Sequence, residues 1–368
     1  MERDLPAASL VFLSRPIIIE NRSTRRRRMS ASLRKFIITR ILLTIPMVLI
    51  LITLVFIIMR ILPGDPIRSQ LGPRVSEAQA NVLRERLGLN RPLIVQYGDF
   101  LVKMITFDFG NALTQGERPI KEELAEKLPA TIELSIPAVI FMAVVGIWSG
   151  AYASKNRKKP IDYIIRLLSI MVYSIPIFVM GLLFQILFAV RLPVFPLAGR
   201  MDTLMLVNFD SPTNFYILDA ILTGNWPALG SVLAHLVLPA FTLGLALTGV
   251  FVRLTRVNMI EMLQSDFITA GRARGIPEQR LVYRHALRNT FIPILTLIGL
   301  QLAALMAGAV LTETTFSWPG IGRYLVERIQ LRDYTAVQST IGVFAMFVAG
   351  ISLIMDILYA FIDPRIRY

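Results

Sequence analysis

Residues 41–59 read ILLTIPMVLILITLVFIIM, nineteen positions without a charged side chain. A helix needs roughly 20 mostly apolar residues to cross the hydrocarbon core of a bilayer. The stretch is too long and too apolar for the surface of a water-soluble domain. It therefore predicts a membrane-spanning helix, which covers about residues 36–62 once its flanks are included.

Further stretches of the same kind follow along the chain, and the whole sequence is 54% hydrophobic and only 17% charged. A soluble domain usually carries about 25% charged residues. The composition and the apolar stretches together predict an all-α, polytopic membrane protein with six transmembrane helices. After the first, the predicted spans cover about residues 134–154, 164–190, 232–252, 289–312 and 334–361.

Lysine and arginine indicate which side of the membrane each loop faces. They gather in the segment before the first span, in the short loop 155–159, and in the long loop 253–288, whereas the stretches between spans three and four and between spans five and six hold few. The charges of the segment 63–133 nearly balance, so it says little about topology. By the positive-inside rule, these three segments and both termini are cytoplasmic. We thus expect a basic cytoplasmic extension over 1–32, a permease-like membrane domain over 33–368, and an external segment over 63–133.

The net charge of +14 does not indicate nucleic-acid binding, because the basic residues lie in short clusters between apolar stretches. There is no cysteine, and there are only two histidines. We therefore expect no disulfide, no metal site, no cofactor and no thiol nucleophile. The phosphate-binding pattern GxxxxGK[ST] is also absent, so the chain is not expected to hydrolyse ATP itself.

The cytoplasmic loop 253–288 is predicted to be helical, because apolar residues recur in it at helical spacing. Its segment 266–275 reads DFITAGRARG. Gly275 suits the left-handed position after a helix, and Pro277 suits the first turn of the next helix. The loop thus predicts a helix, a sharp break at 275–277, and a second helix leading into the fifth span. Small residues at 269–273 leave room for another protein to approach the backbone. The same spacing fits equally well a helix that lies in the membrane interface and ends in a glycine cap.

This segment resembles the conserved cytoplasmic loop of permeases from binding-protein-dependent ABC importers, and several other motifs resemble the oligopeptide and dipeptide branch in particular. Thr269 and Gly271 differ from the broad family, which often has glutamate and alanine there. The similarity extends from about residue 33 to the C-terminus. The other matching motifs are PGDP at 63–66, LGLNRP at 87–92, KLPATIEL at 127–134, RHALRN at 284–289 with Ile292-Pro293, FSWPGIG at 316–322, RDY at 332–334 and DPRIRY at 363–368.

The resemblance implies a B-type permease subunit with a bundle of the type I ABC importer kind, located in the plasma (inner) membrane of a prokaryote. It implies that two cytoplasmic ATPase subunits, a sister permease and an external or periplasmic solute-binding protein complete the transporter. Peptides or similar small solutes are the implied cargo. The residues implied to dock the ATPase are Asp266, Ala270, Gly271, Arg274 and Gly275.

Two aromatic residues on the outer side, Trp318 and Tyr334, are candidates for an outer gate. Arg200, in a predicted external loop, is expected to be replaceable with little effect. Asp356, near the inner end of the sixth span, is expected to pair with an arginine of a loop. The alternative function is an ion-coupled secondary transporter or channel that works without ATPase subunits. It predicts acidic residues deep in the membrane, and the predicted spans lack them.

Overall fold

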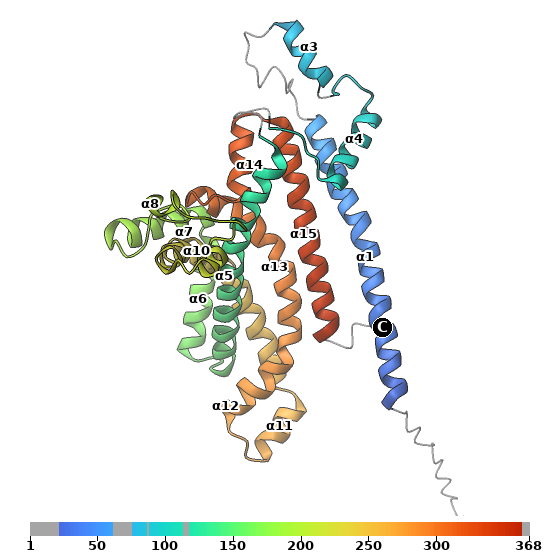
Figure 1. Ribbon diagram of the computed structural model, residues 1–368. Helices are drawn as coiled ribbons and strands as arrows, with labels where there is room; N and C mark the ends of the chain where they lie inside the picture. The colour runs from blue at the N-terminus through green and yellow to red at the C-terminus, as the bar shows by residue number, and fades with distance from the viewer. Residues whose placement is uncertain (1–21, 62–75, 87, 113–117, 363–368) are drawn as a thin grey trace, which may run out of the picture.

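The computed structural model describes residues 22–61, 76–86, 88–112 and 118–362, and over these ranges the protein is all-α apart from one isolated bridge between Asn111 and Pro119 (Figure 1). Residues 1–21, which make up most of the predicted N-terminal extension, lie outside the described residues. So do the motifs at 63–66 and 363–368 and the first residue of the motif at 87–92.

Long helices form the body of the molecule. They are α1 (Arg22–Ile61), α5 (Ile120–Lys155), α10 (Trp226–Leu263), α13 (Leu287–Thr315) and α15 (Tyr334–Ile362). Within the described residues, four helices are long and apolar enough to cross a membrane, and a bent pair brings the number to five. The 29-residue helix α13 coincides with the predicted fifth span. The count of six spans and their orientation remain predictions.

Two of the long helices extend well beyond the predicted spans. α5 begins at Ile120, so its first four turns belong to the predicted external segment 63–133. α10 continues to Leu263, inside the predicted cytoplasmic loop. Each helix continues beyond its apolar stretch into polar sequence. A helix ends where its backbone groups lose hydrogen-bond partners, and the thickness of the bilayer does not set that point.

The predicted third span is broken into two helices. α6 (Pro160–Ser174) and α7 (Ile177–Phe184) with the π-helix η1 (Gln185–Arg191) meet at an angle of 101°. Ile175 is extended, with φ −81° and ψ 125°, directly before Pro176. A proline disfavours the helical conformation of the residue before it, which accounts for the position of the break.

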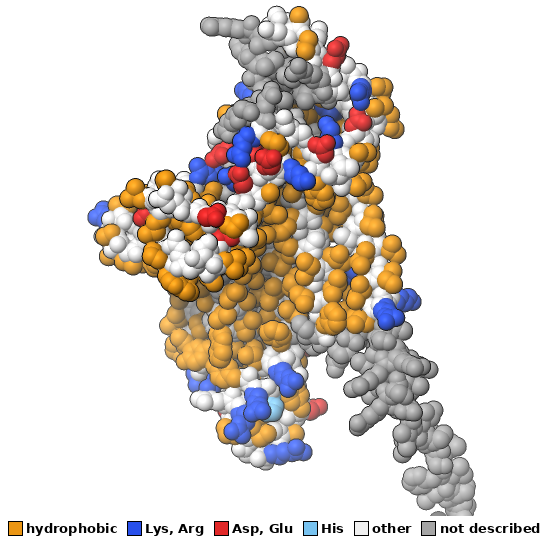
Figure 2. Space-filling view, viewed as in Figure 1, with side chains coloured by type: hydrophobic (Ala, Val, Ile, Leu, Met, Phe, Trp, Pro, Cys, Tyr) orange, Lys and Arg blue, Asp and Glu red, His pale blue; other side chains and the backbone are white. Residues whose placement is uncertain are grey.

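The long helices pack around shared apolar clusters. Leu134 of α5, Leu243 of α10 and Leu305 of α13 belong to one buried cluster, and Phe344 of α15 packs against it. α1 lies at the edge of the bundle, where it contacts α15 and α4 (Leu93–Thr106) (Figure 1). A wide apolar zone separates charged groups at the two ends of the face that Figure 2 shows, as expected of a protein surrounded by lipid.

Short helices lie at the two ends of this bundle. α11 (Asp266–Ala273) and α12 (Glu278–Arg280) lie at one end (Figure 1). α3 (Glu77–Arg86), α4 and α14 (Ile321–Gln330) lie at the other. Between η1 and α10, the chain forms α8 (Thr203–Leu206) and α9 (Tyr216–Leu222). The residues that bear on function therefore divide into two groups, which we call inner (at α11 and α12) and outer (at α4 and α14) after the orientation predicted from the sequence.

Candidate functional site

The inner group is built on α11, which a turn at Gln264 and Ser265 separates from α10. Ile268 is fully buried against Met259 of α10 and against Leu281 and Val282 of the π-helix η2 (Leu281–Ala286). Ala151 of α5 belongs to the same cluster. Because η2 continues directly into α13, the buried side of α11 contacts parts of the chain that lead into three long helices.

The predicted break after α11 is confirmed. Gly275 has φ +76°, in the left-handed region. The Gly275 amide donates to the Arg272 carbonyl at 2.9 Å, and the Ile276 amide donates to the Gly271 carbonyl at 3.1 Å. These two bonds form a Schellman motif, which satisfies carbonyls left open at the end of the helix. The turn therefore needs a residue without a Cβ, or one that tolerates left-handed backbone.

An ion pair crosses this turn from one helix to the next. Arg272 donates to Glu278 from Nε at 3.1 Å and from Nη2 at 2.8 Å. Its hydrogen bonds hold the pKa of the Glu278 carboxyl below the usual range. Sequence reasoning did not find this pair, because nothing in the local pattern of the loop shows that the two side chains meet. The pair fixes the angle between α11 and α12 even though both side chains are about half exposed.

Four of the five predicted docking residues lie on the open side of this loop: Asp266, Ala270, Arg274 and Gly275 are exposed. Gly271 differs, because it is buried and faces Leu281. A Cβ built on Gly271 would lie 2.7 Å from Leu281 Cδ2. The small size of Gly271 therefore allows close packing against Leu281 within the loop. The four exposed residues leave the other side of α11 accessible to a partner.

A hollow of about 460 Å³ lies along α12 and the start of η2, after the turn that ends α11. Arg280 and Arg284 line it together with Pro277, Gln279 and Tyr283. The Tyr283 ring also contacts Trp148 of α5, with ring centroids 5.5 Å apart. Burial raises the pKa of the Tyr283 hydroxyl. The basic hollow is thus formed by α12 and the first turn of η2, and one of its lining residues, Tyr283, contacts α5.

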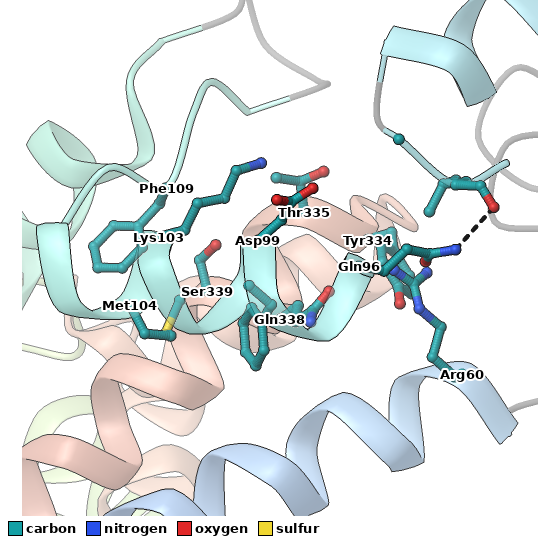
Figure 3. A pocket seen from close by; sticks show the side chains of 13 residues that line it. Arg60, Gln96, Asp99, Lys103, Met104, Phe109, Tyr334, Thr335, Gln338 and Ser339 are labelled. Atoms are coloured by element: carbon teal, nitrogen blue, oxygen red, sulfur yellow. Dashed lines mark hydrogen bonds between the residues drawn. The ribbon is translucent and has the colours of Figure 1, made fainter. Parts of the chain in front are cut away.

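On the outer side, the two candidate gate residues lie in different surroundings. Trp318 is fully buried in the central cluster, and its indole Nε1 donates to the Ala130 carbonyl at 2.8 Å. Tyr334 instead lines a pocket between α1, α4 and α15 (Figure 3). The Arg60 guanidinium lies 5.2 Å from the centroid of the Tyr334 ring. Their role in a gate stays a prediction.

The pocket at Tyr334 has a volume of about 80 Å³ and a polar lining. Figure 3 shows Gln96, Asp99 and Lys103 of α4 on one side of it and Gln338 and Ser339 of α15 on the other. The Gln96 amide nitrogen donates to the Leu89 and Arg91 carbonyls at 3.0 and 2.6 Å. These bonds tie the turn before α4 to the pocket, so α4 is held across the outer ends of α1 and α15.

Glu313, at the outer end of α13, organises the segment that follows it. Its carboxylate accepts from the Thr131 hydroxyl at 2.6 Å and from the Arg323 amide at 3.0 Å. Thr131 in turn accepts from the Ile321 amide at 2.9 Å. The first turn of α14 is therefore attached to both α5 and α13.

Two buried ion pairs strengthen the same outer layer, and sequence reasoning did not find them. Arg328 of α14 donates to Glu123 of α5 at 2.6 Å, across 205 positions of sequence. Arg200 donates to Glu133 with Nε at 3.1 Å and Nη2 at 2.5 Å. The expectation that Arg200 is a replaceable loop residue is wrong, because its side chain is 3% exposed and its partner is buried with it.

Ion pairs also occur near the inner end. Arg256 of α10 holds the buried Asp162 of α6 by two hydrogen bonds, at 2.6 and 2.8 Å. Asp356 pairs with Arg40 at 3.2 Å. Its partner is an arginine, as expected, but it belongs to α1 and not to a loop. Among the described residues, no group of three or more acidic or histidine side chains could hold a metal ion.

Comparison with known proteins agrees with this arrangement of a helical membrane bundle with a structured inner loop. Residues 142–368 match the family described as binding-protein-dependent transport system inner membrane component. Residues 33–135 match the N-terminal region of such membrane components. Both matches lie within the range over which the motifs resemble peptide permeases.

Full-length relatives give the same result. The dipeptide transport system permease protein DppB of Alkalihalophilus pseudofirmus is 40% identical over 89% of this chain and 98% of its own length. The di/tripeptide transport system permease protein DppB of Pseudomonas aeruginosa is 39% identical over 90% of this chain and 98% of its own length. The dipeptide transport system permease protein DppB of Escherichia coli (strain K12) is 36% identical over 91% of this chain and 99% of its own length.

The protein is thus a multi-pass transport subunit of the inner membrane. It belongs to the family of binding-protein-dependent inner-membrane transport components, the permeases of ABC importers. In these systems a binding protein delivers the solute, and separate subunits hydrolyse ATP. The chain is therefore a transport subunit and not an enzyme, and the alternative of a transporter without ATPase subunits is wrong.

Proposed function

We propose that this chain and a sister permease together form a path for dipeptides and tripeptides, and that each permease docks one of two ATPase subunits. The names of the three relatives support the cargo, since each is a dipeptide or di/tripeptide transport system permease protein. The cytoplasmic position of the loop 253–288 is part of the proposal and rests on the distribution of lysine and arginine.

The open face of α11 is the observation that carries the docking proposal. Its buried side belongs to the cluster around Ile268, which joins α5, α10 and η2. A partner that pushes on Ala270 therefore pushes on those helices too, because a close-packed cluster transmits displacement. The Schellman motif at Gly275 and the ion pair between Arg272 and Glu278 keep α11 from moving independently of η2.

Charge indicates the chemistry of the docking partner. Arg274 is exposed at the C-terminal end of α11, and Arg280 and Arg284 line the hollow along α12 and η2. Complementary charge steers association and selects partners. We expect acidic side chains on the ATPase surface that receives this loop.

Site-specific cross-linking tests the docking proposal, and the absence of native cysteine gives a clean background. Ala270→Cys should cross-link to a cysteine scanned through the acidic surface of the ATPase, with a yield that changes when ATP is added. Thr203→Cys, on the exposed outer helix α8, is the matched control and should give no such product. Equal cross-linking from Thr203 and Ala270, or none from Ala270 with any ATPase position, would reject the docking face.

Uptake by the reconstituted transporter tests the cargo. Vesicles that hold both permeases and both ATPases, supplied with the binding protein and ATP, should accumulate labelled dipeptide and tripeptide. A single amino acid is the control and should not accumulate. Uptake of the amino acid in place of the peptides would reject the proposed cargo while leaving the docking result unaffected.

A further inference from the structure

A cavity of about 140 Å³ lies between α6 and α10, outside the docking loop and the outer layer. The two helices are antiparallel there, since Arg256 contacts Asp162 while Gly249 lies against Ser169. A Cβ built on Gly249 would lie 2.6 Å from the Ser169 carbonyl oxygen. The helices therefore touch at the Gly249 level and at the Arg256 level, and residues of both levels line the cavity.

The lining of this cavity changes character along its length. Three arginines lie toward the Asp162 end: Arg166, Arg253 and Arg256. Ile170, Tyr173 and Val250 lie toward the opposite end. The seven steps from Asp162 to Ser169 span roughly 10 Å along a helix. This exceeds the polar region of one leaflet, which is roughly 5–8 Å thick, so a lipid beside this cavity can reach from its phosphate to its acyl chain.

The arginine side chains that line the cavity have hydrogen-bond donors left over to bind an anion. Arg256 uses Nε and Nη2 on Asp162, the only acidic residue it contacts among the described residues. Arg166 and Arg253 are exposed, and the described residues show no hydrogen bond or ion pair for either guanidinium. The Arg166 guanidinium instead lies 5.4 Å from the Tyr163 ring centroid. Three arginines against one carboxylate leave a net charge of about +2 at this end of the cavity.

The outer surface around the cavity is apolar. Leu167, Ile170, Tyr173 and Val257 are each more than half exposed in this chain. The α6 end that carries Asp162 follows the basic loop 155–159, which the positive-inside rule places in the cytoplasm. Basic pockets between transmembrane helices on the cytoplasmic side are suited to anionic lipid head groups.

We propose that this cavity binds an anionic phospholipid of the inner leaflet. Its phosphate lies against Arg166, Arg253 and the free Nη1 of Arg256, and its acyl chain follows Ile170 and Tyr173. Asp162 acts as a positioning residue that holds the Arg256 guanidinium toward the cavity. The lipid fills the gap between α6 and α10, two helices that move relative to one another if the bundle changes shape.

Lipid retention by the complete transporter tests this proposal. The transporter is purified in nanodiscs of phosphatidylcholine with increasing phosphatidylglycerol, and bound lipid is counted by native mass spectrometry. We expect the wild type to retain phosphatidylglycerol selectively. The double variant R166Q/R253Q should bind it about 30-fold more weakly, because each arginine contributes about 1 kcal/mol near an anionic headgroup.

Two further variants separate a specific site from general attraction and from misfolding. R166K/R253K keeps the charges and should retain most of the lipid. R157Q/R288Q removes two exposed arginines outside the cavity and should retain the wild-type amount. The proposal is overturned if R166Q/R253Q retains wild-type lipid while its thermal unfolding is unchanged. It is equally overturned if R157Q/R288Q loses as much lipid as R166Q/R253Q does.

A competition experiment distinguishes a lipid from a free phosphate. Soluble glycerol 1-phosphate should fail to displace phosphatidylglycerol, because it lacks the acyl chain that contacts Ile170 and Tyr173. Displacement at millimolar concentration would mean that the cavity takes a free anion and would overturn the lipid proposal. Retention of the lipid by this chain alone but not by the complete transporter would show that the surface is a subunit interface, which also contradicts the lipid proposal.

Discussion

Glu133 and Arg200 lie 67 positions apart in the sequence and form a buried ion pair in the outer layer, with Arg200 Nε and Nη2 both donating to Glu133 Oε2. The other carboxylate oxygen, Oε1, accepts from the Ile217 amide at 2.8 Å. Arg200 also donates to the Asn214 carbonyl at 2.8 Å and lies 3.7 Å from the centroid of the Tyr216 ring. The pair joins α5 to the segment that leads into α9.

Replacing Arg200 by methionine should destabilise the protein by about 3–5 kcal/mol, because it leaves the Glu133 carboxylate buried without a cation. The double variant E133L/R200M should recover much of this loss, since both charges are then removed. Thermal unfolding in detergent measures the effect. R191Q, at an exposed arginine near the end of η1, is the control and should unfold like the wild type. The prediction would be contradicted if R200M unfolded at the same temperature as R191Q and the wild type.

Replacing Gly275 by valine should abolish peptide uptake and substrate-linked ATP hydrolysis while leaving the protein inserted in the membrane. No atom lies within 4 Å of a Cβ built on Gly275, so the cost within this chain is backbone strain at φ +76°. That strain is roughly 1–2 kcal/mol for a residue with a Cβ.

Gly275→Asn is the matched control, because asparagine visits the left-handed region more readily. It should keep most of the uptake that Gly275→Val loses. Both variants are assayed in vesicles that hold the whole transporter. Full uptake by Gly275→Val with normal recovery of the ATPase would remove this turn from the coupling role.

Replacing Gly271 by valine should destabilise the inner loop by about 1–3 kcal/mol, because it overpacks the contact with Leu281. Shortening the neighbour in the double variant G271V/L281A should recover part of that energy. The coupling between the two changes is read from a double-mutant cycle of thermal unfolding. Strict additivity would show that Gly271 and Leu281 do not contact one another in solution.

The turn between α11 and α12 should loosen at acid pH. The pKa of Glu278 is lowered by its hydrogen bonds to Arg272, so the folded turn binds fewer protons than the unfolded one. The stabilisation is therefore present above the ordinary pKa of 4.5 and is lost as the pH falls through the lowered value.

Hydrogen exchange of the amides at 271–276, corrected for intrinsic rate, measures this loss between about pH 6 and about pH 3. Glu278→Gln should exchange faster than the wild type at the upper pH and should lose most of the pH dependence. The difference is expected to be small, since the pair is about half exposed. If Glu278→Gln showed the same pH dependence as the wild type, a titratable group other than Glu278 would be responsible.

Local features of the inner loop were predictable from the sequence, because each depends on neighbouring residues. The break after α11 follows from Gly275 and Pro277, and the structure confirms the left-handed turn. Which neighbour Gly271 packs against was not predictable in the same way. Whether a small residue faces a partner or faces Leu281 depends on how η2 folds back on α11.

Proline shows how the same residue type gives different results in different surroundings. Pro137, Pro239 and Pro293 lie inside continuous helices, whereas Pro176 separates α6 from α7. Neighbouring helices can satisfy the carbonyl that a proline leaves free. The sequence identifies the prolines, but the packing around each one decides whether the helix continues.

The class of protein follows from the sequence, because apolar stretches of roughly 20 residues are long enough to cross a bilayer and are visible in the chain. The family follows as well, from motifs that occur in the right order. The tertiary structure alone decided which charges are buried together, as with Glu133 and Arg200, and where α6 and α10 separate to leave a cavity. The physical reason is distance along the chain: buried ion pairs depend on residues that are far apart in sequence, and no local pattern records that they meet.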